Sequence, residues 1–166
     1  MKSKFIEEPL TKHHQREAFD CGNLEMNRFF KQYARQSHEK GTSKTYISRH
    51  LDSQQIIGFY TITLSALDQQ HLPELCKKRF GYHPIPLFTL ARLAVDIRYQ
   101  KQGIGGMLLV KALKRCAIVA EQVWGIGLLI EAKDEDISRW YQSYGAIPLE
   151  NMPLTLILLF DTIKGL

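Results

Sequence analysis

A glycine-rich turn between a long apolar stretch and a long amphipathic stretch is the feature that most constrains this fold. The turn follows residues 87–97, and apolar residues at helical spacing run on from it to Ala120. It consists of Gln100, Lys101, Gln102, Gly103, Ile104, Gly105 and Gly106. The pattern predicts a strand, a turn and a helix whose first N–H groups lack partners within the helix. These N–H groups and the positive end of the helix dipole together suit a phosphate. Glycines lack a Cβ, so the backbone can approach the phosphate closely.

Two common phosphate-binding motifs do not fit this turn. A P-loop needs Lys followed by Ser or Thr after its glycines, and a dinucleotide fingerprint needs a third glycine where Leu108 stands. The turn has the form Q/R-x-x-G-x-G/A and resembles the pyrophosphate-binding motif of the GCN5-related N-acetyltransferases, the GNAT family, which bind acetyl-CoA. An ordinary strand-to-helix turn is the alternative for this segment taken alone.

Length and composition indicate one globular domain, residues 1–166. The chain is 45% apolar and 23% charged, and no run approaches the roughly 18 apolar residues of a membrane span. Its start lacks an apolar signal core. Cys21, Cys76 and Cys116 match neither a disulfide framework nor a zinc site. We therefore expect a cytoplasmic protein without a membrane partner or a metal.

Charge is unevenly distributed along the chain. Residues 77–101 hold six Lys or Arg against one Asp, a balance of +5, whereas residues 121–166 hold three basic against seven acidic residues, a balance of −4. Basic stretches suit an anionic ligand or a nucleic acid. The cluster 77–79 is the best candidate for contact with a polyanion, and a merely solvated surface is the alternative.

The order of expected elements indicates an α/β (α+β) fold with helices on both faces of a mixed sheet. Strands are expected near 4–7 and over 45–49, 56–67, 87–97, 126–132 and 154–161, and helices between Asn23 and Gly41, over 105–120 and over 134–144. This order matches that of the GNAT family, with the glycine turn between the fourth strand and the third helix.

The segment Leu90–Asp96 resembles the fourth GNAT strand. The resemblance implies that main-chain groups of Leu93, Ala94 and Val95 pair with the pantetheine arm of acetyl-CoA. It also implies a mostly antiparallel sheet that is splayed between its fourth and fifth strands, from Leu93–Val95 to Ile130–Ala132. All seven residues of the glycine turn are then expected to bind the pyrophosphate.

The segment Trp140–Ala146 resembles the GNAT element F-Y-x-x-x-G-F. The resemblance implies that Tyr141 presents its phenol to the acetyl-CoA sulfur as the general acid for the leaving thiolate. Tyr144 lies three residues further on and competes for this role, since residues at i and i+3 share a helix face. Core packing is the alternative for either tyrosine.

The amino-terminal quarter resembles the GNAT toxins of type II toxin–antitoxin systems. Their pattern H-x(4)-F-D/x-C-G begins at His14 and includes Phe19–Gly22, and their G-x-S-R-T-Y matches Gly41–Tyr46 with Lys44 in place of Arg. The resemblance implies acetylation of the α-amino group of an aminoacyl-tRNA, which blocks translation. It further implies a ribbon-helix-helix antitoxin and a homodimer. His13 and His14 lie on a short connector and are interpreted as solvated or structural.

Direct transfer of the acetyl group suits such an acceptor. An α-amino group has a pKa of about 7.7–8.0, so a useful fraction is neutral and nucleophilic without a strong base. Proximity of amine and thioester then suffices, and no Cys-His or Ser-His-Asp arrangement is needed. The alternatives are a GNAT enzyme that acetylates a protein N-terminus or a small amine, and a non-catalytic module that binds acetyl-CoA.

Overall fold

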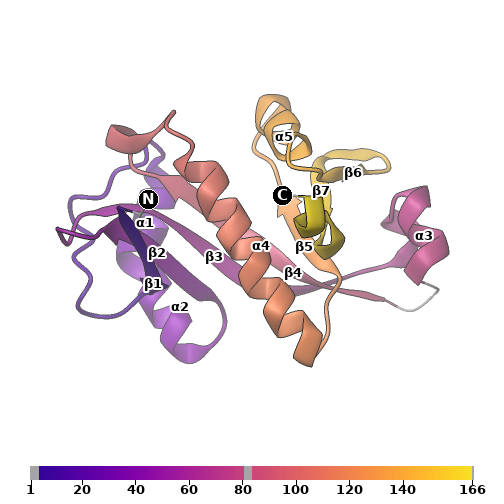
Figure 1. Cartoon of the computed structure of the whole chain (residues 1–166), viewed down its shortest axis with the longest axis horizontal. Coiled ribbons are helices and arrows are strands. Elements are labelled where there is room, and N and C mark those ends of the chain that lie inside the picture. Colours follow the sequence, from indigo (N-terminus) through magenta and orange to yellow (C-terminus); the bar gives the residue numbers. More distant parts are fainter. Residues whose placement is uncertain (1–3, 81–83, 166) are drawn as a thin grey trace. The chain divides into compact units, whose positions relative to one another are not determined.

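The computed structural model describes residues 4–80 and 84–165 of the chain, which contains one seven-stranded sheet of order β1-β2-β3-β4-β5-β7-β6. The strands are β1 (Phe5–Pro9), β2 (Lys44–His50), β3 (Ile56–Leu67), β4 (Ile85–Val95), β5 (Gly127–Glu131), β6 (Ile147–Leu149) and β7 (Met152–Leu159). The α-helices are α1 (Leu24–Arg28), α2 (Ala34–Lys40), α3 (Glu74–Phe80), α4 (Ile104–Gln122) and α5 (Glu135–Gln142). Figure 1 shows these elements along the chain.

The chain divides into two compact units. The first comprises Met1–Thr63 and Ala91–Lys111, and the second comprises Leu64–Leu90 and Ala112–Leu166. The boundaries fall within β3, β4 and α4, so the polypeptide of each of these elements contributes to both units.

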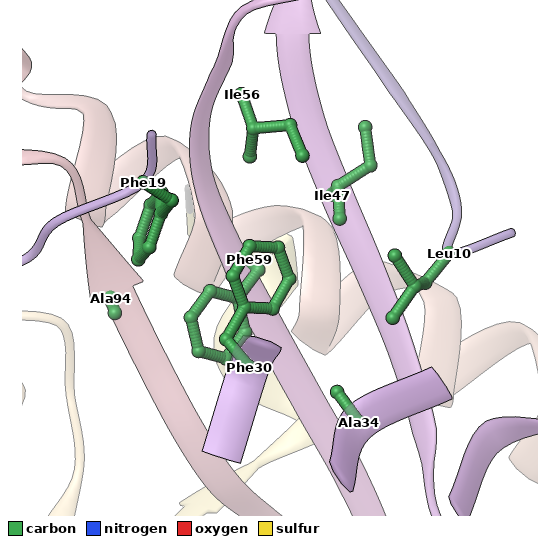
Figure 2. Close-up of a cluster of buried hydrophobic side chains, with 8 residues drawn as sticks. All are labelled: Leu10, Phe19, Phe30, Ala34, Ile47, Ile56, Phe59 and Ala94. Carbon is green, nitrogen blue, oxygen red and sulfur yellow. The ribbon is translucent and has the colours of Figure 1, made fainter. Parts of the chain in front are cut away.

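The core of the first unit lies between α1–α2 and the antiparallel strands β1, β2 and β3. The rings of Phe30 and Phe59 stack with centroids 4.1 Å apart, and Phe19 meets Phe30 edge-on at 4.9 Å. Figure 2 shows this cluster, to which Ala94 of β4 also contributes. Fully burying an aromatic ring contributes about 2–3 kcal/mol, so the cluster fixes α1–α2 on the sheet.

The helical region between Asn23 and Gly41 is interrupted by a π-helical segment, Phe29–Tyr33. Its beginning and end follow the predicted caps: Asn23 accepts from the N–H of Met26, and Gly41 has a left-handed φ of +78°. In the π segment the N–H of Ala34 bonds to the carbonyl of Phe29, five residues back. The sequence predicts one or more helices between these caps, which the structure confirms, and it does not predict the π segment.

The first half of α4 covers the opposite face of the sheet in this unit. Gly58 makes that packing possible, because a Cβ there would lie 2.8 Å from both the carbonyl oxygen of Ala94 and the Cδ1 of Leu108. Phe59, the next residue of β3, faces the aromatic cluster instead. The prediction of helices on both sheet faces is therefore confirmed.

The second unit contains the parallel pair of the mixed sheet. β4 pairs with β5 from Phe88↔Leu128 to Leu90↔Ile130, and β5 and β6 both pair antiparallel with β7. Its core includes Leu72, Cys76, Leu87 and Ile157. The predicted mixed, mostly antiparallel sheet is confirmed. The predicted splay concerns residues of two different units and stays a prediction.

Several element bounds differ from those expected from the sequence. β4 ends at Val95, and Ile97 belongs to a 3₁₀ turn, Ile97–Tyr99, because Asp96 caps that turn by accepting from the N–H of Arg98. Helix α3 and the short strand β6 were not predicted. Helix α5 ends at Gln142, two residues before the expected end. Among the described residues, no helix is long and apolar enough to cross a membrane.

Candidate functional site

The glycine turn joins β4 to α4 within the first unit. Its backbone is left-handed at two positions, with φ +62° at Lys101 and +80° at Gly103. The N–H of Met107 bonds to the carbonyl of Gly103 at 3.1 Å, so regular helix bonding starts from Gly103. The N–H groups of the first helical turn precede this donor and have no partner within the helix. They form the helix start at which the sequence predicts that an anion binds.

Gln100 holds the turn in place through its side chain. The amide nitrogen donates to the carbonyl of Val95 at 2.8 Å and to the carbonyl of Cys21 at 3.0 Å. The side chain of Gln100 thus connects the end of β4, the connector before α1 and the glycine turn. Both N–H groups of the side chain are used in this way, so Gln100 can donate to a ligand only through its main chain.

Asp96 is the buried anchor beneath the turn. Its side chain is fully buried and accepts from the N–H of Asp20 at 3.2 Å and from both the main chain and the guanidinium of Arg98 at 2.9–3.0 Å. Burial acts to raise the pKa of Asp96, but the hydrogen bonds from Arg98 and Asp20 outweigh it and hold this pKa below its usual value. The carboxylate is therefore charged at neutral pH and holds the 3₁₀ turn Ile97–Tyr99, which leads into the glycine turn.

The tripeptide Asp20–Gly22 is tied to the same turn. The N–H of Ile97 donates to the carbonyl of Asp20, while Asp20 itself accepts from Gly22 and from the amide of Asn27. This explains part of the Phe19–Gly22 motif in physical terms. Sequence reasoning did not assign Asp96 or Asp20 to the site, because Asp96 falls within the stretch 87–97 that was expected to be a strand. The available signal was that Asp is a common cap residue.

The residues present fit a pyrophosphate. A Cβ added at Gly103 would meet no atom within 4 Å, so the space beside the turn is open, and Lys101 and Gln102 are exposed. The other predicted contacts lie inward: Ile104, Gly106 and Ala94 are buried, and Leu93, Val95 and Gly105 are half-buried. Such residues can contact a ligand only through their backbone or a small exposed area. The first unit brings all ten predicted acetyl-CoA residues together.

Tyr141 lies in the second unit, on α5. Asp134 caps this helix by accepting from the N–H of Ile137, and the buried hydroxyl of Ser138 donates to the carbonyl of Pro153 at 3.0 Å. Tyr141 is only 7% exposed, and burial raises the pKa of its phenol to about 12. The phenol is therefore protonated at neutral pH and can donate a hydrogen bond.

Tyr144 does not share a helix face with Tyr141, because it lies in the turn after α5. The main-chain N–H groups of Tyr144 and Ala146 both donate to the carbonyl of Tyr141. Gly145 closes this turn with φ +99°, and a Cβ there would approach the Cγ2 of Thr162 to 2.7 Å. Both rings nevertheless meet Trp140, with centroids 4.9 Å away for Tyr141 and 5.1 Å away for Tyr144, so the competition between the two tyrosines stays a prediction.

Other polar residues singled out in the sequence have structural partners. His14 lies 2.8 Å from Glu8, its Nδ1 accepts from the N–H of Thr11, and its structural interpretation is confirmed. In the cluster 77–79, Lys77 pairs with Glu74 and Glu150 and Arg79 with Asp161, so its charge is largely balanced. Within the described ranges, no cluster of His, Cys, Asp or Glu suits a metal ion.

A mixed sheet with one parallel pair, followed by a glycine turn that opens α4, defines a GNAT-type N-acetyltransferase. Two relatives match nearly the whole chain. The probable toxin TacT of Sinorhizobium fredii is 34% identical over 99% of this chain and 96% of its own length. A tRNA-acetylating toxin of Mycobacterium tuberculosis is 24% identical over 90% of this chain and 88% of its own. No family model matches the chain.

Three solved structures share the fold. A Tyr-to-Phe variant of KacT superposes with a TM-score of 0.90 at 27% identity, covering 98% of this chain and 99% of its own. AtaT complexed with acetyl-methionyl-tRNA superposes with 0.89 at 29% identity, covering 96% and 97%. AtaT bound to acetyl-CoA and the C-terminus of the antitoxin AtaR superposes with 0.81 at 27% identity, covering 98% and 97%. The chain belongs to the GNAT toxins of type II toxin–antitoxin systems.

Proposed function

We propose that this chain is an acetyl-CoA-dependent N-acetyltransferase toxin that acetylates the α-amino group of aminoacyl-tRNA and so blocks translation. The observation that carries the proposal is the glycine turn, whose helix-start N–H groups, left-handed Gly103 and open flank fit a pyrophosphate. The relatives support the acceptor: one is named a tRNA-acetylating toxin, and AtaT is known with acetyl-methionyl-tRNA.

Residues 1–166 act as a single N-acetyltransferase domain in the cytoplasm. The backbone from Gln100 to Gly106 holds the pyrophosphate of acetyl-CoA, and main-chain groups of Leu93, Ala94 and Val95 pair with the pantetheine arm. The Val95 carbonyl already accepts from Gln100, and it retains its second lone pair for a ligand. The antitoxin partner is a ribbon-helix-helix protein, and the toxin acts as a homodimer. The complex of AtaT with the C-terminus of the antitoxin AtaR supports an antitoxin partner for this chain.

Bound acetyl-CoA supplies the acetyl group as a thioester, so that a C–N bond to the neutral α-amino group forms as the C–S bond breaks. Tyr141 acts as the general acid by donating its phenol hydrogen to the departing sulfur. A thiol of pKa about 8.5 is more acidic than a phenol of pKa about 12. Tyr141 therefore stabilises the leaving thiolate mainly by a hydrogen bond and less by complete proton transfer. The proton lost by the amine passes to solvent.

The test is incubation with radiolabelled acetyl-CoA and charged total tRNA, beside deacylated tRNA, an N-terminal peptide and a polyamine. Alkali-labile label on charged tRNA alone is the expected result, since acetyl-amino acid is released when the ester is hydrolysed. Label on deacylated tRNA, or only on the peptide or the polyamine, would overturn the proposed acceptor. Absence of label from every acceptor, despite acetyl-CoA binding, would indicate a binding module.

A further inference from the structure

The first unit has a concave surface away from the glycine turn, beside α1 and the π-helical segment. This pocket has a volume of about 330 Å³ and is lined by Glu25, Arg28, Phe29, Tyr33 and Arg92. Its size lies at the small end of the range for ligand sites. None of these residues belongs to the glycine turn, and Tyr141 lies in the other unit, so neither the proposed acetyl-CoA contacts nor the general acid accounts for it.

Two arginine–aromatic pairs build the pocket. The guanidinium of Arg92 lies over the ring of Phe29, 4.0 Å from its centroid, and that of Arg28 lies 5.8 Å from the centroid of Tyr33. Arg28 also donates to the hydroxyl of Tyr33 at 3.3 Å. Phe29 and Tyr33 are the first and last residues of the π-helical segment. π-helical turns are frequent at functional sites.

The charges of the pocket are not neutralised by ion pairs. In the described part of the chain, no salt bridge involves Arg28, Arg92 or Glu25, and the pocket carries two positive charges and one negative charge. Tyr33 leaves 45% of its surface exposed. The pocket thus offers two cations, an accessible aromatic ring and one carboxylate acceptor.

A single-stranded nucleotide has the complementary chemistry. Unpaired RNA bases stack on aromatic rings and guanidinium planes, arginine binds phosphate, and a glutamate accepts from an exocyclic amino group such as that of cytosine. Arg92 directly precedes Leu93 on β4, so the pocket begins on the strand that leads to the glycine turn.

Resting on the proposed function, we propose that this pocket binds an unpaired nucleotide of the 3′-terminal single strand of the aminoacyl-tRNA. Arg28 and Arg92 contact its phosphate, Tyr33 stacks on its base, and Glu25 favours bases with an exocyclic amino group over uracil. The pocket thereby positions the esterified amino acid for transfer, and it acts on every charged tRNA because all of them share the same 3′ end.

The test measures binding of labelled RNA hairpins by fluorescence anisotropy. One hairpin ends in a single-stranded CCA tail, one in a UUU tail, and one is blunt. The wild-type protein should prefer the CCA tail. Tyr33→Ala should reduce this preference about tenfold, because stacking on one aromatic ring is lost. Arg92→Gln should lower the slope of log affinity against log salt by about 0.7, the value for one phosphate contact on a single strand.

Three further variants separate specific contacts from structural damage. Arg35→Gln removes the same charge from a half-buried position of α2, where Arg35 forms an ion pair with Glu39, and should leave both the preference and the salt slope unchanged. Arg92→Lys keeps the positive charge and should therefore keep the dependence of affinity on salt. It should still bind the CCA hairpin more weakly, because lysine lacks the planar guanidinium that stacks. Glu25→Gln should narrow the difference between CCA and UUU tails. Melting temperatures identify any variant that has not folded.

The outcomes distinguish the pocket from the proposed function. Suppose that the wild-type protein acetylates charged tRNA, and that Tyr33→Ala and Arg92→Lys bind the CCA hairpin as tightly as the wild type. The pocket assignment is then overturned, while the proposed function stands. A wild-type protein that binds blunt and tailed hairpins equally also overturns it. If tail-dependent binding is lost in these variants while the wild type acetylates no charged tRNA, the pocket stands and the enzymatic proposal falls.

Discussion

The side-chain amide of Gln100 donates to the main-chain carbonyl of Val95 over 2.8 Å, so the first residue of the glycine turn is fixed to the last residue of β4. The same nitrogen reaches the carbonyl of Cys21. The candidate anion site is thus held in shape by one side chain before any ligand binds. A preformed site binds more tightly because less ordering is left for the binding step.

Gln100→Ala should therefore weaken acetyl-CoA binding about tenfold. Each hydrogen bond contributes about 1 kcal/mol net, and losing both leaves the turn free to move. Isothermal titration calorimetry measures the effect. Gln122→Ala, the same change at the exposed end of α4, should bind as the wild type does. Unchanged binding by Gln100→Ala would show that the turn keeps its shape without the clamp.

Gly103 allows charge to be separated from backbone strain. Its φ is +80° and the space beside it is open, so Gly103→Gln should fold with a loss of about 1 kcal/mol for the left-handed conformation. Gly103→Glu adds a side chain of the same size that carries a negative charge, and this variant should bind acetyl-CoA much more weakly than Gly103→Gln. The difference should shrink between 50 and about 300 mM salt, as screening requires. Equal affinities of the two variants at low salt would place the pyrophosphate elsewhere.

Local rules explain which parts of this structure the sequence predicts. The cap at Asn23, the left-handed Gly41 and the glycine turn all follow from short patterns, and all are found. The π segment was missed because it depends on packing and on distant groups such as Arg16, which donates to the carbonyl of Phe30. The role of Gln100 was missed because Cys21 is 79 residues away in the sequence.

Asp96 should be the most sensitive residue for stability near the site. Asp96→Asn removes a buried carboxylate that accepts from Asp20 and Arg98, and we expect a loss of about 2 kcal/mol at pH 7. The pKa of Asp96 is lowered, so its stabilisation is present above pH about 4 and is lost as pH falls through that lowered pKa. Urea unfolding at several pH values measures both effects.

The matched control is Asp52→Asn in the exposed turn between β2 and β3. It should change the free energy of unfolding by less than about 0.5 kcal/mol. The wild type and Asp96→Asn should approach one another in stability as the solution becomes strongly acidic. A constant difference from neutral to acid pH would mean that hydrogen-bond geometry, rather than the charge of Asp96, stabilises the turn.

Tyr141→Phe should lower kcat about 10²-fold, the scale of general acid catalysis, and leave acetyl-CoA affinity unchanged. Because burial raises the pKa of Tyr141 to about 12, its phenol keeps its proton throughout the working range. The wild-type rate should rise with the fraction of neutral α-amine, around pH 8, and show no decline below pH about 10. Tyr144→Phe should keep both rate and profile, since Tyr144 lies outside α5. A fall in the wild-type rate near pH 9 that disappears in Tyr141→Phe would show that the phenol ionises far more readily than its burial implies. If Tyr144→Phe lowered kcat as much as Tyr141→Phe does, the general acid would instead be Tyr144, in the turn after the helix.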